Sequence, residues 1–258
     1  MEPALLCEVS GALATVTISN PAKRNAMTPG MWRQLPALLD RLAADASVRV
    51  LVLTGAGNTF CAGADISSLG GADDPRDLAA AAEDALAAFP KPALAVLRGH
   101  CVGGGCQLAV ACDLRFAAEG TVFGITPARL GIVYPASSTQ RLVRLTGPSA
   151  AKHLLFSAEL IGTGRALRTG LVDEVLPAGQ LDDRVREFTQ ALVERSQLTQ
   201  AAAKEFADGP ADAARIAHWA EAARAGGEAE EGVSAFLERR PPRFGRHPHG
   251  LPPSTTHG

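Results

Sequence analysis

Three consecutive glycines, Gly103, Gly104 and Gly105, stand between an apolar run that favours a buried strand and a run that favours a buried helix. The strand is predicted at 92–97 and the helix at 108–112. Glycine permits positive φ angles and lets other atoms approach the backbone closely. The first N–H groups of a helix have no partner inside it, and the helix dipole adds partial positive charge there. The turn is therefore either a tight packing point or a place that holds an anion or a developing oxyanion.

A second glycine-rich turn follows another apolar run. Residues 50–54 predict a buried strand, and residues 55–66 contain three further glycines. Two such turns can each offer one backbone N–H to a single carbonyl oxygen, which favours the oxyanion interpretation of the first turn.

The composition limits the classes of protein that this chain can belong to. It has 258 residues, 47% hydrophobic and 20% charged, which suits one large domain or one domain with a subdomain. The net charge of −2 without a long run of one sign argues against nucleic-acid and membrane-surface binding. Five cysteines without a CxxC or Cys/His cluster predict reduced thiols, a cytoplasmic protein and no metal site.

Strands and helices alternate along the first part of the chain, which predicts βα units and a largely parallel sheet. The first expected elements are a hairpin over 5–19 and a helix that Thr28 caps, in which Pro36 either interrupts the helix or marks its true start. Further strands are expected at 48–54, 113–117, 122–123 and 171–176. Further helices are expected over 76–89, from Pro148 onward and over 163–170. Small polar residues at 67–77 predict a mobile loop. Helices dominate after residue 181, and the last one is expected from Glu228 to about Arg239.

The two glycine turns, together with Asn20-Pro-Ala-Lys-Arg-Asn-Ala-Met27, resemble the crotonase superfamily, also called the enoyl-CoA hydratase/isomerase family. The resemblance extends to about Phe244. It implies an α/β fold with a spiral core of ββα turns and a C-terminal helical trimerisation region. On this basis residues 1–200 are the acyl-CoA-binding core, 201–240 the helical region, and 241–258 a tail that we expect to be disordered. The implied assembly is a homotrimer or a dimer of trimers.

The resemblance also implies a substrate joined to coenzyme A as a thioester, and an enolate-like oxyanion held by two backbone N–H groups. Matching motif to motif assigns these groups to Ala64 and Gly104. The residues that it places near CoA are Lys23, Arg24, Ala62, Asp65, Ile66, Phe236 and Arg239, the last two often from a neighbouring subunit. Simple structural roles compete with these: Asp65 as a brace of its own turn, and Phe236 as packing for the last helix. No cofactor is implied apart from the CoA of the substrate.

The chain departs from the family pattern where hydratases carry two glutamates that activate water. These positions hold Gln107 and Pro127. Neither side chain exchanges a proton near neutral pH, and a glutamine amide orients water without deprotonating it. Ordinary hydration of an enoyl thioester is therefore not expected from these two positions.

Decarboxylation of a malonyl-type thioester needs no such base, because the electrons come from the breaking C–C bond. An oxyanion site stabilises the enolate, and an apolar pocket favours loss of the charged carboxylate. Residues 126–134 resemble the corresponding segment of methylmalonyl-CoA decarboxylases, where a tyrosine points at the carboxylate. This adds Tyr134, the only tyrosine of the chain, to Ala64, Gly104 and Gln107 as candidate catalytic residues. Those decarboxylases carry histidine where this chain has Ala64, so the resemblance is partial.

Two alternatives stay open beside a decarboxylating lyase. One is an enoyl-CoA hydratase or isomerase of fatty acid metabolism whose acid/base has moved, with Asp73, Asp74, Asp77 and Glu83 as candidates. The other is an acyl-CoA-binding protein without catalysis.

Overall fold

The computed structural model describes residues 2–65 and 75–245. Most of the loop expected at 67–77, and most of the tail expected from 241 onward, lie outside the described residues. The described chain has an α/β fold, which confirms the fold class expected from the sequence.

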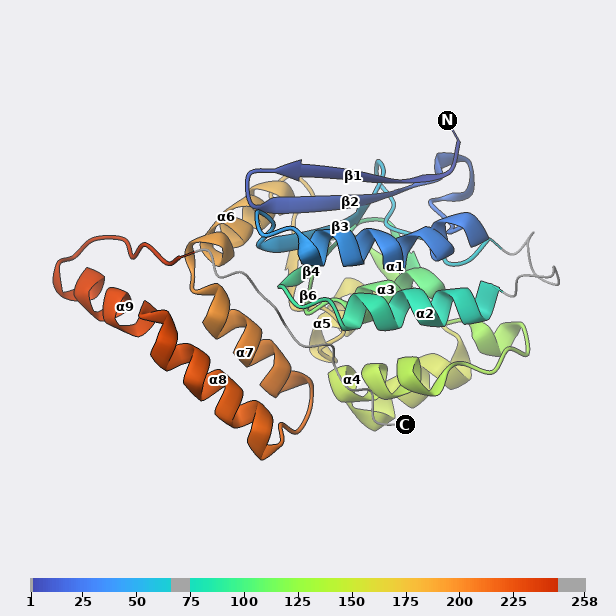
Figure 1. The fold of residues 1–258 in the computed structure, drawn as a ribbon. Helices are drawn as coiled ribbons and strands as arrows, with labels where there is room; N and C mark the ends of the chain where they lie inside the picture. Colours follow the sequence, from blue (N-terminus) through green and yellow to red (C-terminus); the bar gives the residue numbers. More distant parts are fainter. Residues whose placement is uncertain (1, 66–74, 246–258) are drawn as a thin grey trace.

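A six-stranded sheet forms the centre of the molecule, in the order β1-β2-β3-β4-β6-β9 (Figure 1). Its strands are β1 (Ala4–Ser10), β2 (Leu13–Ser19), β3 (Val50–Gly55), β4 (Ala93–Leu97), β6 (Leu114–Ala118) and β9 (Glu174–Leu176). The first two strands pair antiparallel as the expected hairpin, and every later pair in this sheet is parallel. A smaller sheet joins β5 (His100–Val102), β7 (Val122–Gly124) and β8 (Ile161–Gly162).

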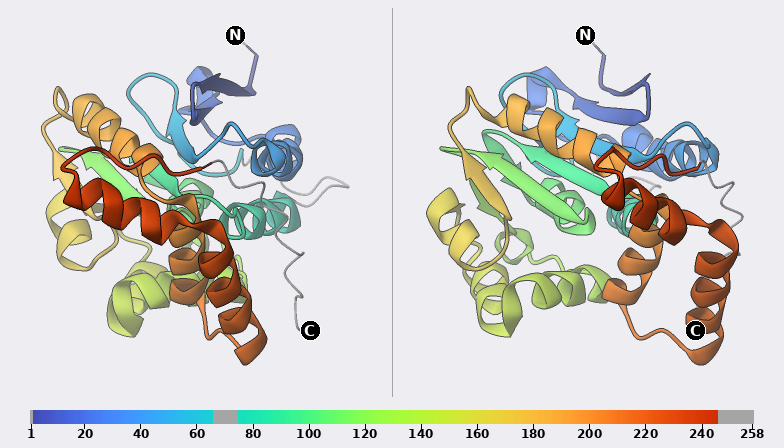
Figure 2. Two further views of the ribbon diagram at one scale, coloured as in Figure 1. Left: turned by 60° about the vertical axis from the view of Figure 1, so that its left-hand side comes forward. Right: turned by 90° about the vertical axis from the view of Figure 1, so that its left-hand side faces the viewer.

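Helices surround these sheets (Figure 2). They are α1 (Pro29–Ala44), α2 (Pro75–Ala87), α3 (Gly104–Ala111), α4 (Ala136–Ser157), α5 (Thr163–Arg168), α6 (Leu181–Glu194), α7 (Gln197–Asp208), α8 (Ala213–Gly226) and α9 (Glu228–Leu237), with 3₁₀ turns η1 (Pro21–Lys23) and η3 (Pro127–Arg129). None of the described helices is long and apolar enough to cross a membrane.

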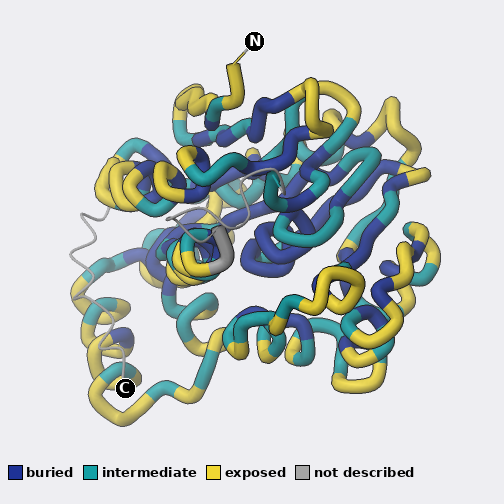
Figure 3. Tube along the Cα trace, turned by 90° about the vertical axis from the view of Figure 1, so that its right-hand side faces the viewer, coloured by how far each residue is buried: buried dark blue, intermediate teal, exposed yellow. Residues whose placement is uncertain are grey.

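The sheet is covered on both faces, and alternate residues of one strand face different layers. Leu51 and Leu53 of β3 belong to the main core with α1, α2 and α3, whereas Val52 packs in a second cluster with Leu181 of α6. The tube in Figure 3 shows the buried chain in the middle of the molecule, and residues 105–111 of α3 are all buried. Continuous apolar runs in the sequence therefore correspond to strands that are buried on both sides.

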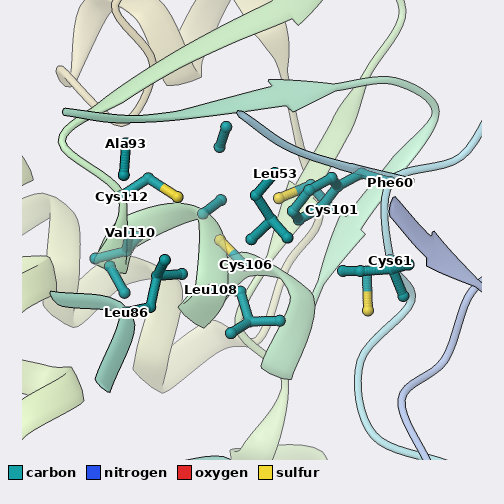
Figure 4. Close-up of a cluster of buried hydrophobic side chains, with 14 of the residues drawn as sticks. Leu53, Phe60, Cys61, Leu86, Ala93, Cys101, Cys106, Leu108, Val110 and Cys112 are labelled. Atoms are coloured by element: carbon teal, nitrogen blue, oxygen red, sulfur yellow. The ribbon is translucent and has the colours of Figure 1, made fainter. Parts of the chain in front are cut away.

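Four of the five cysteines belong to this core. The side chains of Cys61, Cys101, Cys106 and Cys112 lie among leucine, valine and phenylalanine side chains (Figure 4). Burial raises the pKa of the Cys61 and Cys112 thiols to about 12, so they stay protonated and pack as small apolar groups.

Two helices differ from their expected limits. Thr28 caps α1 as expected, since its hydroxyl accepts from Met31 N at 3.3 Å, but the helix runs through Pro36 without a break. The buried face of α1 continues past Pro36 and outweighs the backbone hydrogen bond that proline removes. Helix α4 begins at Ala136, earlier than expected; its second half starts at Pro148 as predicted, because the backbone of Gly147 (φ 77°) is not helical and separates the two halves.

The C-terminal helices α7, α8 and α9 project from the body of the molecule (Figure 1). Helices α7 and α8 share a small apolar cluster of Leu198, Ala201 and Trp219. Helix α9 exposes Val233, Phe236 and Leu237, so several large apolar side chains on it are uncovered in the single chain.

Candidate active site

The two glycine turns, defined here as residues 61–65 and 101–105, lie against each other. Cys61 and Cys101 form a parallel β-bridge, and Val102 N donates to Cys61 O at 3.0 Å. Gly63 (φ 110°) and Gly103 (φ 56°) occupy backbone conformations that side chains disfavour. The bridge and these two glycines bring chain segments about forty residues apart to one place.

The backbone amides of Ala64 and Gly104 come close together at this junction. Gly104 is the first residue of α3, so its N–H has no acceptor within the helix. On the other turn, Met27 exchanges hydrogen bonds with Gly63 O and Asp65 N, both at 2.8 Å, which turns the N–H of Ala64 away from that bridge. A Cβ built on Gly104 would lie 3.6 Å from Ala64 N.

Trp32 fixes the position of the Gly104 backbone. A Cβ on Gly104 would stand 3.0 Å and 3.2 Å from two carbons of the fully buried Trp32 ring. Glycine at 104 thus lets the start of α3 rest directly on α1. We did not identify Trp32 from the sequence; the only signal there is a tryptophan in the first turn of a predicted helix.

A cavity of about 840 Å³ opens beside the two amides. Its walls include Ala22, Lys23, Arg24, Ala26, Ala62, Gly63, Ala64, Asp65, Ala79, Gly103, Gly104, Gln107, Thr126, Pro127, Leu130, Ile132, Val133, Tyr134 and Pro135. Lys23 is ion-paired with Asp65, with Nζ 2.9 Å and 2.7 Å from the two carboxylate oxygens. The segment from Pro127 to Val133 gives an apolar wall, so the lining combines a charged part with an apolar part.

A cluster of polar side chains, here called the polar cluster, lies behind Gln107. It consists of Glu83 from α2, Gln107 from α3, Tyr134, and Ser138 and Arg141 from α4. The Ser138 hydroxyl donates to Glu83 Oε2 and accepts from Gln107 Nε2, the latter at 3.1 Å. Arg141 Nη1 donates to the same Glu83 oxygen at 3.0 Å. This chain of hydrogen bonds holds the Gln107 amide in one orientation.

Two oxygens of the polar cluster lack a partner. Glu83 Oε1 and the Tyr134 hydroxyl are buried and have no hydrogen bond within the described residues. Burial raises the pKa of Glu83 to about 7, against the hydrogen bond from Ser138 and the positive charge of Arg141, which lower it. Burial, with the nearby Glu83 charge, also raises the pKa of Tyr134 well above its ordinary value.

Most of the residues selected from the sequence line this cavity of about 840 Å³. All four candidate catalytic residues do so: Ala64, Gly104, Gln107 and Tyr134. Of the residues expected near CoA, Lys23, Arg24, Ala62 and Asp65 line it, and Ile66 lies outside the described residues. Phe236 and Arg239 do not line it within this chain, and Phe236 is 83% exposed.

The four acidic residues proposed as a relocated acid or base differ in position and burial. Asp73 and Asp74 lie outside the described residues, Asp77 is exposed in the first turn of α2, and Glu83 is buried in the polar cluster. Within residues 2–65 and 75–245, no group of three or more His, Cys, Asp or Glu side chains could hold a metal ion.

This architecture defines a class of α/β proteins in which two glycine turns present neighbouring backbone amides to a deep cavity. Residues 8–247 match the enoyl-CoA hydratase/isomerase family, and the chain belongs to that family. It is thus an enzyme of the crotonase superfamily, whose membership implies an acyl-CoA substrate.

Relatives and solved structures agree with this assignment. The chain is 34% identical to 2,3-dehydroadipyl-CoA hydratase of Escherichia coli, over 89% of this chain and 93% of the relative. It is 33% identical to crotonyl-CoA hydratase of Syntrophomonas wolfei, over 92% and 97% of the two chains. A crystal structure of an enoyl-CoA hydratase/isomerase family member matches with a TM-score of 0.87 and 36% identity, covering 95% of this chain and 98% of the other.

Proposed function

We propose that the enzyme acts on an acyl-CoA thioester through an enolate whose oxygen accepts from the N–H groups of Ala64 and Gly104, and that it decarboxylates a malonyl-type thioester. The supporting observation is how few carboxylates line the cavity among the described residues. Among the described lining residues the only one is Asp65, and it is ion-paired with Lys23. Gln107 and Pro127 stand where the hydratase glutamates are expected.

The charged part of the cavity suits the CoA portion of the substrate. Lys23 and Arg24 place positive charge at the cavity wall beside Ala62 and Asp65, where phosphate groups would bind. The thioester carbonyl then reaches the two glycine turns, and the acyl group lies against the apolar segment that contains Leu130 and Ile132.

The reaction needs no base for its first step. The C–C bond to the carboxylate breaks, carbon dioxide leaves, and the electron pair moves into the enolate, whose oxygen the two amides stabilise. Removing one such donor typically costs roughly 2.7–4 kcal/mol of activation free energy. The apolar wall disfavours the charged carboxylate before it is lost, while Tyr134 and the fixed amide of Gln107 orient it.

A substrate panel tests this proposal. We expect turnover of methylmalonyl-CoA or ethylmalonyl-CoA, slow or absent hydration of crotonyl-CoA, and saturable binding of acetyl-CoA in calorimetry. Hydration of crotonyl-CoA at an ordinary enzymatic rate, with no reaction of any malonyl-type thioester, would refute decarboxylation. Acetyl-CoA binding without any turnover would favour a binding protein.

Two sets of variants sharpen the panel. Tyr134→Phe should lower turnover of the malonyl-type thioester and leave CoA affinity nearly unchanged, because Tyr134 lines the cavity beside Gln107 and the substitution leaves Lys23 and Arg24 untouched. Gln107→Glu with Pro127→Glu should also lower it, since added carboxylates repel that of the substrate. If the protein is instead a hydratase that lost its acid and base, this double variant should hydrate crotonyl-CoA about 10²–10⁴-fold faster.

A hydratase or isomerase with a relocated acid/base is the second candidate. Glu83 is the observation that favours it, because its buried carboxyl has a pKa of about 7 and lies beside Gln107 and Tyr134. The names of the relatives point the same way, since both are hydratases. The crotonyl-CoA arm of the panel separates the two candidates.

A further inference from the structure

A second, much smaller cavity of about 10 Å³ lies within the polar cluster. Its walls include Glu83, Gln107, Tyr134, Ser138 and Arg141. Gln107 and Tyr134 also line the large cavity, so these two side chains form the wall between the two spaces.

The two unpartnered oxygens of the polar cluster belong to residues that border this small space. Buried polar atoms nearly always have a hydrogen-bond partner, so Glu83 Oε1 and the Tyr134 hydroxyl are exceptions that need an explanation. A cavity of roughly 10–15 Å³ holds one water molecule when polar groups surround it. One water between the two oxygens would satisfy both and would connect the Glu83 carboxyl to Tyr134, a residue whose side chain also lines the large cavity.

We propose that Glu83 is the proton reservoir of this site and acts through Tyr134 on the α-carbon of the bound enolate. The inference rests on the enolate chemistry proposed above, but on neither of its two candidate reactions in particular. Glu83 itself does not touch the substrate, so it is a positioning and proton-supplying residue rather than a catalytic one.

Three proton transfers connect Glu83 to the substrate. The α-carbon of the enolate takes the proton of the Tyr134 hydroxyl, so a C–H bond forms while the O–H bond breaks. The water in the small cavity returns a proton to the Tyr134 oxygen and receives one from Glu83. Ser138 and Arg141 stabilise the carboxylate that remains, and solvent reprotonates it after product release. No electrons are gained or lost beyond the bonds named.

The charges around the relay suit transfer near neutral pH. Arg141 from α4 and Asp84 from α2 face Glu83 with opposite signs, and Tyr134 adjoins it. Cys106 from α3 faces Tyr134. With a pKa of about 7, Glu83 can both give up and regain a proton at neutral pH, which an ordinary glutamate or the Tyr134 phenol alone does far less readily.

Exchange of the α-protons of butyryl-CoA in D₂O tests the relay, because exchange forms the enolate without decarboxylation. NMR should show exchange by the wild-type protein that accelerates as pH rises through about 7, since removal of the proton requires the Glu83 carboxylate. In Glu83→Gln the amide keeps an acceptor for Ser138 and Arg141, so exchange should fall about 10²–10⁴-fold and lose this pH dependence. Calorimetry should show butyryl-CoA affinity unchanged, and Glu83→Asp should recover part of the rate.

Asp77→Asn provides the matched control, since it removes an exposed carboxylate from the same helix. It should exchange like the wild type. Exchange by Glu83→Gln at the wild-type rate would overturn the relay, as would wild-type protein that binds butyryl-CoA without exchange. If Glu83→Gln does not fold, Tyr134→Phe takes its place and should show the same loss of α-proton exchange. Exchange at the wild-type rate in Tyr134→Phe would overturn the relay. A protein that exchanges α-protons but decarboxylates nothing refutes decarboxylation and leaves the relay standing.

Discussion

The two glycine turns and the polar cluster lie on the same cavity but build their chemistry from different groups. In the turns the groups are the backbone amides of Ala64 and Gly104, placed by glycine conformations and by contact with Trp32. In the polar cluster they are the side chain of Tyr134, which precedes α4, and side chains from three helices, α2, α3 and α4, held by hydrogen bonds across 31 and 55 residues of sequence. Backbone amides do not titrate, whereas side chains can change both reaction and pH dependence.

The two regions also differ in how they affect the free energy of folding. The turns meet through ordinary backbone hydrogen bonds such as Val102 N to Cys61 O, so preorganising their amides requires no buried charge. The polar cluster buries Glu83, which is 1% exposed, and desolvates its carboxylate. We infer that a shared oxyanion site can accommodate different reactions because only the side-chain region has to change.

Gly104→Ala should have the largest effect on activity. The added methyl would meet the buried Trp32 ring at 3.0 Å, a tight contact, so we expect the start of α3 to move by a few tenths of an ångström and its first N–H to lose its alignment. Loss of one oxyanion donor predicts a kcat about 10²–10³-fold lower, whichever acyl-CoA proves to be the substrate.

Gly162→Ala is the control for this substitution, because Gly162 has φ −87° and no atom lies within 4 Å of the new Cβ. It should retain wild-type kcat. Full activity in Gly104→Ala would contradict the comparison, because the two glycine turns would then not supply the amides that stabilise the enolate.

Glu83→Gln should change how stability depends on pH. The folded pKa of about 7 exceeds the ordinary value of 4.5, so the folded state binds more protons than the unfolded state between these values. The contribution of Glu83 to stability is therefore fully present below about pH 4.5 and is lost as pH rises through about 7. At roughly 1.36 kcal/mol per pKa unit, the loss approaches about 3 kcal/mol.

Urea unfolding at pH 5 and pH 8 measures this effect. The decrease in unfolding free energy between the two pH values should be smaller in Glu83→Gln than in the wild type by up to about 3 kcal/mol. Equal decreases in the two proteins would mean that Glu83 titrates normally, and the energetic contrast between the two regions would disappear.

Helix α9 supplies a third region to the comparison. Val233, Phe236 and Leu237 expose large apolar surface, and we expect it to be buried in a homotrimer or a dimer of trimers. Phe236→Ser should weaken each contact by about 2 kcal/mol, the effect of a typical interface hot spot. Light scattering should then show smaller species at micromolar concentration, and Leu6→Ser, an equally apolar change at an exposed residue of β1, should not.

CoA affinity in the same variant tests whether a second copy completes the site. If Phe236 and Arg239 reach the cavity of a neighbouring copy, the Phe236→Ser variant should bind CoA more weakly when its oligomer dissociates. A wild-type protein that is monomeric at micromolar concentration would exclude a contribution of α9 to the CoA site of a neighbouring copy.

The fold could be predicted from the sequence where its signals are local. Apolar runs give the buried strands, and glycines at strand ends give the two turns, because a backbone conformation depends on its own residues. The first half of α4 was missed because Ser137, Ser138 and Thr139 favour caps and turns over helix interiors.

The polar cluster could not be predicted, because its members are brought together by the packing of three helices and of the segment that precedes α4. The sequence suggested Glu83 only as one of four acidic candidates, and nothing in it indicated Ser138 or Arg141. Trp32 was missed for the same reason, since its role is a contact between α1 and α3. Local patterns thus identify backbone sites, while side-chain constellations depend on tertiary structure.

Lys23→Gln should have the smallest effect, and it tests whether binding and reaction are separate. Lys23 is half exposed and ion-paired with Asp65, an arrangement that contributes about 0–1 kcal/mol in solvent. Because the contact to CoA would be equal in the ground state and the transition state, KM should rise by less than about tenfold while kcat stays unchanged. The affinity difference from the wild type should shrink at high salt, and Lys152→Gln, at an exposed lysine of α4, should match the wild type throughout. A large fall in kcat for Lys23→Gln would show that the Lys23–Asp65 pair holds the Ala64 turn in place, and the charged part of the cavity would then belong to the reacting site.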